Sequence, residues 1–229
     1  MNLKAIDSLE NELIGRYKSE IEKMTSRLSD AAFKRMLLQR HWTSYAFTFL
    51  YDYGIDGMAD EGAKKILRNI RNDEYPPEGP SHREDLVHDL RLIGMDLEDI
   101  INAAPSRQTL KMIRQQAEFL RIKEEQEMHD IKVTAFLRFA LEILVSVEYG
   151  VFVQRMEDFG LTRRNSKFYW PHFMHDMKQN PLGAAGKTHS DMLSECLANM
   201  LDNLKKVQCC SKATQKAYEL RAGFFSQKF

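Results

Sequence analysis

The sequence predicts an all-α protein. Glycine and proline number only 11 and 6 among the 229 residues, and they gather at a few joints. Between these joints the apolar residues recur three and four positions apart, which is the spacing of one helix face. No segment shows the sustained alternation of apolar and polar residues that a half-buried strand requires. Because the composition does not shift along the chain, we expect a single domain over residues 1–229.

Helix caps and helix-breaking residues divide the chain into segments. A Pro/Gly run at 76–80 must end one helix, and Ser81, with Glu84 three positions later, has the capping-box spacing that begins the next. Gly160 ends a long apolar segment. The expected helices, in order, cover residues 7–28, 29–51, 60–74, 81–94, 96–103, 106–127, 128–159, 168–176 and 188–207. The last segment, residues 211–229, is expected either to dock as a helix or to fray.

The apolar pattern supports these helices individually. In the helix over 7–28, leucine and isoleucine at helical spacing form one inner face. The helix over 29–51 is rich in aromatic residues, and a turn bounded by Gly54 and Gly57 is expected after it. The helix over 128–159 is the most apolar, so we expect it near the centre of the fold.

Charge and hydropathy exclude two classes of partner. The chain has 33 basic and 33 acidic residues, so it lacks the basic excess of a nucleic-acid-binding surface. The most apolar run, residues 136–153, is interrupted by Arg138, Glu142 and Glu148, and is too short and too charged to span a bilayer. We therefore expect neither a nucleic acid nor a membrane as partner.

Cysteine usage predicts a reducing environment. There are three cysteines, an odd number without a Cys-x-x-Cys pair, which argues against a disulfide framework and a zinc ribbon. The first residues carry no apolar stretch of the secretory type. The expected location is the cytoplasm.

Two carboxylate–imidazole pairs carry the chemical signal. His172 and Asp176 are four residues apart, so in a helix both side chains leave the same face. Glu74 and His82 flank the Pro/Gly run far upstream. Imidazole and carboxylate groups are ligands of first-row transition metals. Two such pairs, from the two halves of a helical chain, predict a two-metal centre built between helices.

The order of these motifs resembles a known family. Asn72-Asp-Glu74 is followed by Gly-x-x-His82-x-x-x-Leu-x-x-x-Leu-x-x-x-Gly94, and later by Phe-Tyr-x-x-His172-x-x-x-Asp176. This pattern resembles the haem-oxygenase-like di-metal oxidases and oxygenases over residues 67–193. No histidine has glutamate three positions before it, so the ferritin-like Glu-x-x-His arrangement is disfavoured.

The resemblance implies fold, cofactors and activity together. The fold would be a single-domain haem-oxygenase-like bundle of seven to eight helices that binds no haem. Two iron ions, or iron and manganese, would react with O2 as co-substrate and oxidise a small carboxylate substrate by N-oxygenation, desaturation or C–C cleavage. The compact, aromatic helix over 29–51 favours an amino acid over a fatty acid, and Arg40 or Arg138 is a candidate to hold its carboxylate. A homodimer is a possible assembly.

The resemblance implies six metal ligands, of which Glu74, His82, His172 and Asp176 match directly. The fifth is a bridging glutamate from the apolar helix, where two residues compete. Glu142 precedes His172 by 30 residues, which suits two ligands near the middle of long antiparallel helices. Glu148, at 24 residues, is the alternative.

The last ligand of the family is a histidine three residues after the aspartate, where this chain has Gln179. His189, beyond the Asn180-Pro-Leu-Gly183 break, is the favoured replacement if the next helix swings in. His175 is a weaker alternative, because it leaves the helix in another direction than Asp176.

Two other classes of function remain open. The carboxylate–imidazole pairs could be ion pairs in a metal-free helical binding or scaffold protein of the same fold. A cofactorless hydrolase would need Cys196 as a nucleophile, and no histidine or aspartate stands at a recognisable spacing from it. Tests of bound metal and of thiol reactivity distinguish these functions.

Overall fold

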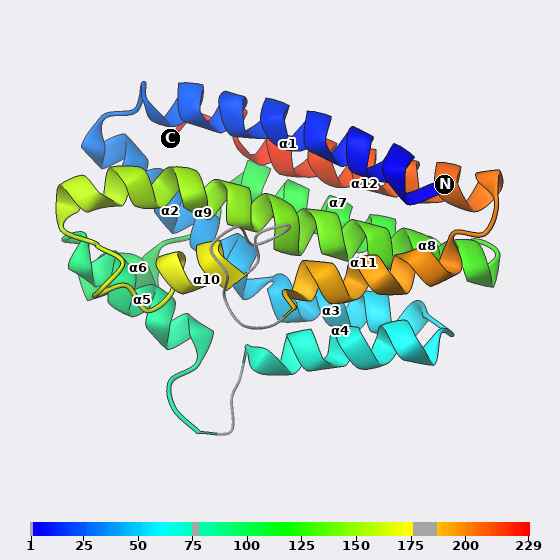
Figure 1. The fold of residues 1–229 in the computed structure, drawn as a ribbon. Coiled ribbons are helices and arrows are strands. Elements are labelled where there is room, and N and C mark those ends of the chain that lie inside the picture. The colour runs from blue at the N-terminus through cyan, green and yellow to red at the C-terminus, as the bar shows by residue number, and fades with distance from the viewer. Residues whose placement is uncertain (1, 75–77, 176–186) are drawn as a thin grey trace.

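The computed structural model describes residues 2–74, 78–175 and 187–229, which contain helices and no strand (Figure 1). The expected all-α class is confirmed. The α-helices are α1 (Asn2–Thr25), α2 (Asp30–Tyr45), α3 (Phe47–Gly57), α4 (Glu61–Asp73), α5 (His82–Leu92), α6 (Leu97–Asn102), α7 (Arg107–Arg121), α8 (Gln126–Leu137), α9 (Leu144–Met156), α10 (Tyr169–His175), α11 (His189–Met200) and α12 (Leu204–Phe224). A π-helical turn, η1 (Arg138–Ile143), joins α8 to α9, and a 3-10 turn, η2 (Glu157–Phe159), follows α9.

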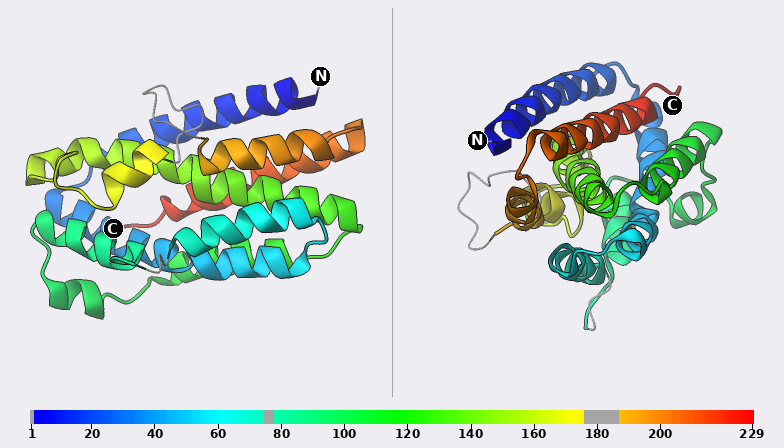
Figure 2. Two further views of the ribbon diagram at one scale, coloured as in Figure 1. Left: turned by 60° about the horizontal axis from the view of Figure 1, so that its bottom comes forward. Right: turned by 90° about the vertical axis from the view of Figure 1, so that its right-hand side faces the viewer.

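The continuous rod formed by α8, η1 and α9 lies at the centre, as its apolar sequence predicts. Nearly every side chain along it is buried. Helices α1 and α12 pack along one side of the rod, α3 contacts α8, α10 packs on α9 and α11 packs on η1 (Figures 1 and 2). Burial of this rod by the surrounding helices supplies the main hydrophobic stabilisation of the fold.

The C-terminal segment is docked, which decides between the two expectations for residues 211–229. Helix α12 packs against α1, α7 and α8, with Phe224 buried. The helix expected over 188–207 is wrong at its end. It stops at Met200, and Asn203 caps α12 by accepting a hydrogen bond from the Lys206 backbone N–H at 3.1 Å. An asparagine N-cap without glycine or proline left no clear breaker in the sequence.

The turn expected at Gly54 and Gly57 is also wrong. Both glycines lie within α3, where the absence of a side chain allows close packing against α8. A Cβ on Gly54 would lie 2.9 Å from Leu137 Cδ1, and one on Gly57 would lie 2.4 Å from His129 Nε2. The helix expected over 29–51 is divided at Ala46 into α2 and α3.

Two expected boundaries are confirmed. Ser81 accepts from the Glu84 backbone N–H while the Glu84 carboxylate accepts from the Ser81 backbone N–H, a complete capping box at the start of α5. Gly160 ends the 3-10 turn η2, which follows the central rod, with φ of 89°, a left-handed conformation that glycine adopts without strain. No helix among the described residues combines the length and apolarity needed to cross a bilayer.

Buried His41 on α2 makes a testable contribution to the pH dependence of stability. Its side chain stacks with Trp42, its Nδ1 has no hydrogen-bond partner, and burial lowers its pKa from 6.5 to about 4. Between about pH 6.5 and pH 4, His41 therefore carries a proton in the unfolded chain but not in the folded chain. The free energy of unfolding falls as the pH drops through this range. We expect His41→Leu to remove up to about 3 kcal/mol of this loss in urea titrations across that range. If the free energy of unfolding changes as much between pH 7 and pH 4 in His41→Leu as in the wild type, the assignment to His41 is wrong.

Candidate metal centre

A cavity of about 300 Å³ opens between the central rod and the helices around it. Its lining comes from α2, α3, α4, α5, η1, α9, α10, α11 and α12 and from the residues that adjoin these helices. Five of the residues expected as metal ligands line it: Glu74, His82, Glu142, His172 and His189. Residues from distant parts of the sequence thus meet in one pocket.

Three of these residues form a compact cluster. One potential ligand atom from each of Glu74, His82 and His172 lies within 4.8 Å of the others. His82 Nδ1 is 3.0 Å from Glu74 Oε1 and 3.3 Å from His172 Nε2. Two nitrogens and one carboxylate oxygen at this spacing fit a first-row transition metal, with room for further ligands.

The backbone fixes the tautomer of His172. Its Nδ1 lies 2.7 Å from the Phe168 carbonyl oxygen, which can only accept, so the proton is on Nδ1. The lone pair is then on Nε2, the atom that faces His82 and Glu74. A histidine that ligates a metal commonly donates its other ring N–H in this way.

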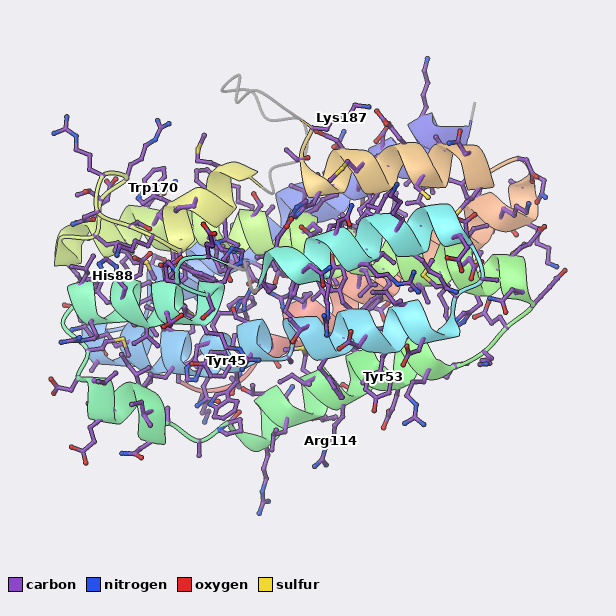
Figure 3. All side chains as sticks on the ribbon, turned by 90° about the horizontal axis from the view of Figure 1, so that it is seen from below. Tyr45, Tyr53, His88, Arg114, Trp170 and Lys187 are labelled. Carbon is purple, nitrogen blue, oxygen red and sulfur yellow. The ribbon has the colours of Figure 1, made fainter. Side chains whose placement is uncertain are left out.

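Asp89 joins the two helices that carry the histidines. It lies on α5 two turns after His82, and its side chain is fully buried. Its carboxylate accepts hydrogen bonds from the backbone N–H groups of residues 167, 168 and 169, at 2.8 to 3.0 Å, and from Ser166 Oγ at 2.6 Å. These donors form the start of α10, so Asp89 acts as its N-terminal anchor. Figure 3 shows α5 and α10 side by side, near the labelled His88 and Trp170.

Gly150 lets α10 approach the central rod. A Cβ at this position would lie 2.6 Å from Phe173 Cε2, on the residue that follows His172. Ser146, one turn earlier on α9, donates a hydrogen bond to the Phe173 carbonyl oxygen at 3.1 Å. The rod and Asp89 therefore hold α10 from two sides.

Gly150→Val tests this packing. The added side chain would displace Phe173 and move His172, and we expect the affinity of the three-residue cluster for Co(II) to fall about 10-fold or more. Gly15→Ala, in α1, is the matched control, because a Cβ there meets nothing within 4 Å. Isothermal titration of both variants checks the prediction, and equal affinities would contradict it.

A second group lies in the same cavity, around Glu142. Its carboxylate accepts a hydrogen bond from Tyr51, and its Oε2 lies 3.3 Å from His189 Nδ1. His189 is the first residue of α11, which begins with a capping box between Thr188 and Asp191. The other ring nitrogen of His189 lies 3.1 Å from Asp73 Oδ2. Glu142 belongs to η1, and π-helical turns of this kind are frequent at functional sites.

Glu148, the alternative bridging residue, is engaged elsewhere. It is fully buried, and its carboxylate accepts hydrogen bonds from Arg40, Arg221 and Tyr17. Burial alone would raise the pKa of Glu148, but the Arg221 and Arg40 charges outweigh it and hold that pKa below its ordinary value. Glu148 is thus an ionised partner of two arginines, which leaves Glu142 as the better-placed glutamate.

The remaining candidates differ in their surroundings. Asp176 and the side chain of His175 lie outside the described residues. Arg40 lines the cavity. Arg138 is not among the described residues that line it; its guanidinium pairs with buried Glu10 and donates a hydrogen bond to Ser194 Oγ.

Cys196 lacks the environment of a nucleophile. Burial raises the pKa of its thiol to about 11, so the thiolate is scarce near neutral pH. It is also not among the described residues that line the cavity. The hydrolase alternative therefore loses the nucleophile that it would require.

Comparisons with known proteins bear on the fold. No family model matches the chain, and no curated protein matches it. A domain of unknown function with a haem oxygenase-like fold, from Shewanella denitrificans, superposes with a TM-score of 0.69 at 13% identity, over 97% of this chain and 88% of that one. The chain has a haem oxygenase-like fold. A TenA family transcription regulator from a Silicibacter species superposes with a TM-score of 0.61 at 14% identity, over 97% of this chain and 95% of that one.

The expected bundle is therefore confirmed as a haem oxygenase-like fold. At 13–14% identity the likeness concerns the arrangement of helices and carries no activity with it. The metal centre is argued from the residues of this chain.

Several residues of the cavity escaped the sequence reasoning. Asp73 precedes Glu74 directly and was not singled out as a functional residue, yet it contacts His189. Arg221 lies in the terminal segment, where no motif drew attention to it, and Tyr51 was read only as part of an aromatic helix. Asp89 gave the one available signal, since it stands two helical turns after His82 and so on the same face.

Proposed function

We propose that this protein is an O2-dependent, non-haem oxidoreductase with two metal ions, two irons or iron and manganese, that oxidises a small carboxylate substrate. The observation that carries the proposal is the convergence of Glu74, His82 and His172, with Glu142 and His189 in the same cavity. Asp176, the residue after His175 in the sequence, is proposed as a further ligand because its position matches the family motif. Iron bound there would supply the electrons for O2 reduction.

The residues of the chain fit this task. Carboxylates are anionic oxygen ligands that balance the positive charge of hard metal ions, whereas imidazoles are neutral nitrogen ligands. A set that mixes the two suits iron. The Phe168 carbonyl orients His172, and Tyr51 donates a hydrogen bond to Glu142. Asp73 holds the outer nitrogen of His189, so that Nδ1 faces Glu142. These outer contacts are those that commonly orient metal ligands.

The apolar wall has a second role. Phe47, Leu141, Val145 and Phe168 line the cavity beside the polar residues. Such a wall excludes bulk water from the reacting groups and holds the substrate against them. A volume of about 300 Å³ lies at the small end of ligand pockets and favours an amino acid over a long fatty acid.

The cellular location and the oligomeric state are part of the same proposal. The three cysteines are free, which suits a reducing cytoplasm. We propose a cytoplasmic enzyme, and size-exclusion chromatography with light scattering would distinguish a homodimer from a monomer.

The competing function is a metal-free binding or scaffold protein. The contacts His82–Glu74 and His189–Asp73 also satisfy the geometry of ion pairs, and this observation favours it. The two functions differ in bound metal after iron supplementation under anaerobic conditions. The oxidase requires close to two equivalents per chain, and no bound metal at micromolar Fe(II) would favour the scaffold.

The activity itself is tested by rapid mixing. Protein loaded anaerobically with Fe(II) is mixed with O2 in the presence of individual amino acids and fatty acids, and O2 consumption and Fe(III) absorption are followed. The proposal predicts that one class of acid accelerates O2 consumption. If every acid leaves the rate equal to that of Fe(II) in buffer, the proposed activity is wrong.

A further inference from the structure

Three buried charges in the cavity region take no part in the metal cluster. Arg40 on α2 and Arg221 on α12 both line the cavity, and both pair with Glu148 on α9. Each arginine is only 2% exposed. Because two cations share one carboxylate, the trio carries one net positive charge. A buried net charge of this kind is unfavourable unless an anion balances it. The other carboxylates that line the cavity, those of Asp73, Glu74 and Glu142, contact His82 and His189 in the two groups described above.

The two arginines also retain unused donors. Arg40 donates from Nε to Glu148 and from Nη1 to Thr43 and Ser44. Arg221 donates from Nε and Nη2, both to Glu148. Within residues 2–74, 78–175 and 187–229, neither Arg40 Nη2 nor Arg221 Nη1 makes a hydrogen bond. These two atoms are not among the buried side-chain atoms that lack a partner, and both residues line the cavity, so their N–H groups are open to the cavity and available to a ligand from outside the chain.

Tyr149 relates this pair to the metal cluster. The Arg40 guanidinium carbon lies 5.0 Å from the centre of the Tyr149 ring, and that ring centre lies 6.1 Å from the His172 ring centre. The distance from the Arg40 guanidinium carbon to the centre of the His172 ring is therefore at most the sum of these two distances. Tyr149 Oη is 3.2 Å from Ser44 Oγ, which also accepts from Arg40, so the tyrosine is fixed between the two ends.

We propose that Arg40 and Arg221 form an anion subsite that binds the carboxylate of a small acid in this cavity. One net positive charge matches a monoanion, and the planar guanidinium groups match the geometry of a carboxylate. Held there, a short acid places its other end beside Tyr149 and His172. The use of the acid as an oxidase substrate rests on the proposed function, whereas its binding does not depend on a metal.

Binding is measured on metal-free protein by isothermal titration, with two matched pairs of probes: hexanoate with hexanamide, and L-leucine with L-leucinamide. We expect at least one acid to bind about 10-fold or more tightly than its amide, because only the acid supplies the anion. Inorganic phosphate is titrated as a third probe. Tighter binding of phosphate than of every acid would overturn the assignment to carboxylates.

Variants locate the binding. Arg40→Gln and Arg221→Gln are each expected to weaken acid binding at least 10-fold. Glu148→Gln leaves both guanidinium groups but raises their net charge, so it is expected to strengthen acid binding several-fold. Arg138→Gln is the matched control, because Arg138 is also buried and paired with a buried glutamate but does not belong to the described lining of the cavity. Circular dichroism establishes that each variant is folded.

The outcomes are distinct. Equal binding of acid and amide by the folded wild type overturns the subsite, as does a loss in the two arginine variants no larger than in Arg138→Gln. If either arginine variant fails to fold, Glu148→Gln and Arg221→Lys decide, and unchanged or weaker acid binding in Glu148→Gln overturns the subsite. Iron content measured on separate samples tests the oxidase independently. Acid binding without iron binding would keep the subsite and refute the enzyme.

Discussion

His172→Ala is expected to abolish tight binding of the first metal ion. The substitution removes one of three clustered ligand atoms, and the remaining Glu74 and His82 cannot enclose an ion alone. Loss of an outer hydrogen bond to a ligand already costs 10- to 100-fold in affinity, so loss of the ligand itself is expected to cost at least about 100-fold. Anaerobic titration with Co(II), followed by visible absorption, measures the effect without any assay of activity.

The control for this variant is His129→Ala. His129 lies on α8, is buried against Gly57, and is not among the described residues that line the cavity. We expect its Co(II) titration to match that of the wild type within about threefold. A His172→Ala protein that binds Co(II) as tightly as the wild type would show that the ion lies elsewhere, even if the stoichiometry were unchanged.

Asp89→Ala is expected to have the largest effect on stability, together with a loss of metal affinity. Its buried carboxylate accepts three backbone hydrogen bonds and one from Ser166 at the start of α10. Leaving these donors unpaired is expected to cost about 3 kcal/mol or more in the free energy of unfolding. With its N-terminal anchor lost, α10 no longer holds His172 in register with His82, and we expect Co(II) affinity to fall about 10- to 100-fold.

Asp130→Ala separates the two effects. Asp130 is also buried, and it accepts hydrogen bonds from the backbone N–H groups of Ala59 and Asp60 and from Gln126, beside the start of α4. We expect a comparable loss of stability by urea denaturation with Co(II) affinity retained. Equal losses of affinity in the two variants would mean that Asp89 acts through general stability and does not position α10.

The sequence predicted the architecture because its signals are local. The capping box at Ser81, the break at Gly160 and the apolar central rod follow from backbone rules that need no tertiary knowledge. Boundaries that depend on tertiary packing were missed. Gly54 and Gly57 looked like a turn, but contact with α8 requires glycine there within a helix.

The candidate site was predictable to the extent that motif spacing encodes it. Glu74, His82 and His172 meet as two separated carboxylate–imidazole pairs implied. The choice between Glu142 and Glu148 needed coordinates, because both lie in one apolar run and only packing shows that Glu148 pairs with Arg40 and Arg221. Partners such as these are separated by about 70 to 110 residues, and no local pattern connects them.

The central claim is that Glu74, His82 and His172 hold a metal ion beside a second one at Glu142 and His189. Anomalous X-ray scattering at the iron edge, from crystals grown anaerobically with Fe(II), tests it most directly. We predict two peaks in the cavity, the first bonded to Glu74, His82 and His172 and the second to Glu142 and His189. Crystals with full iron exposure and no anomalous peak in the cavity would contradict the account.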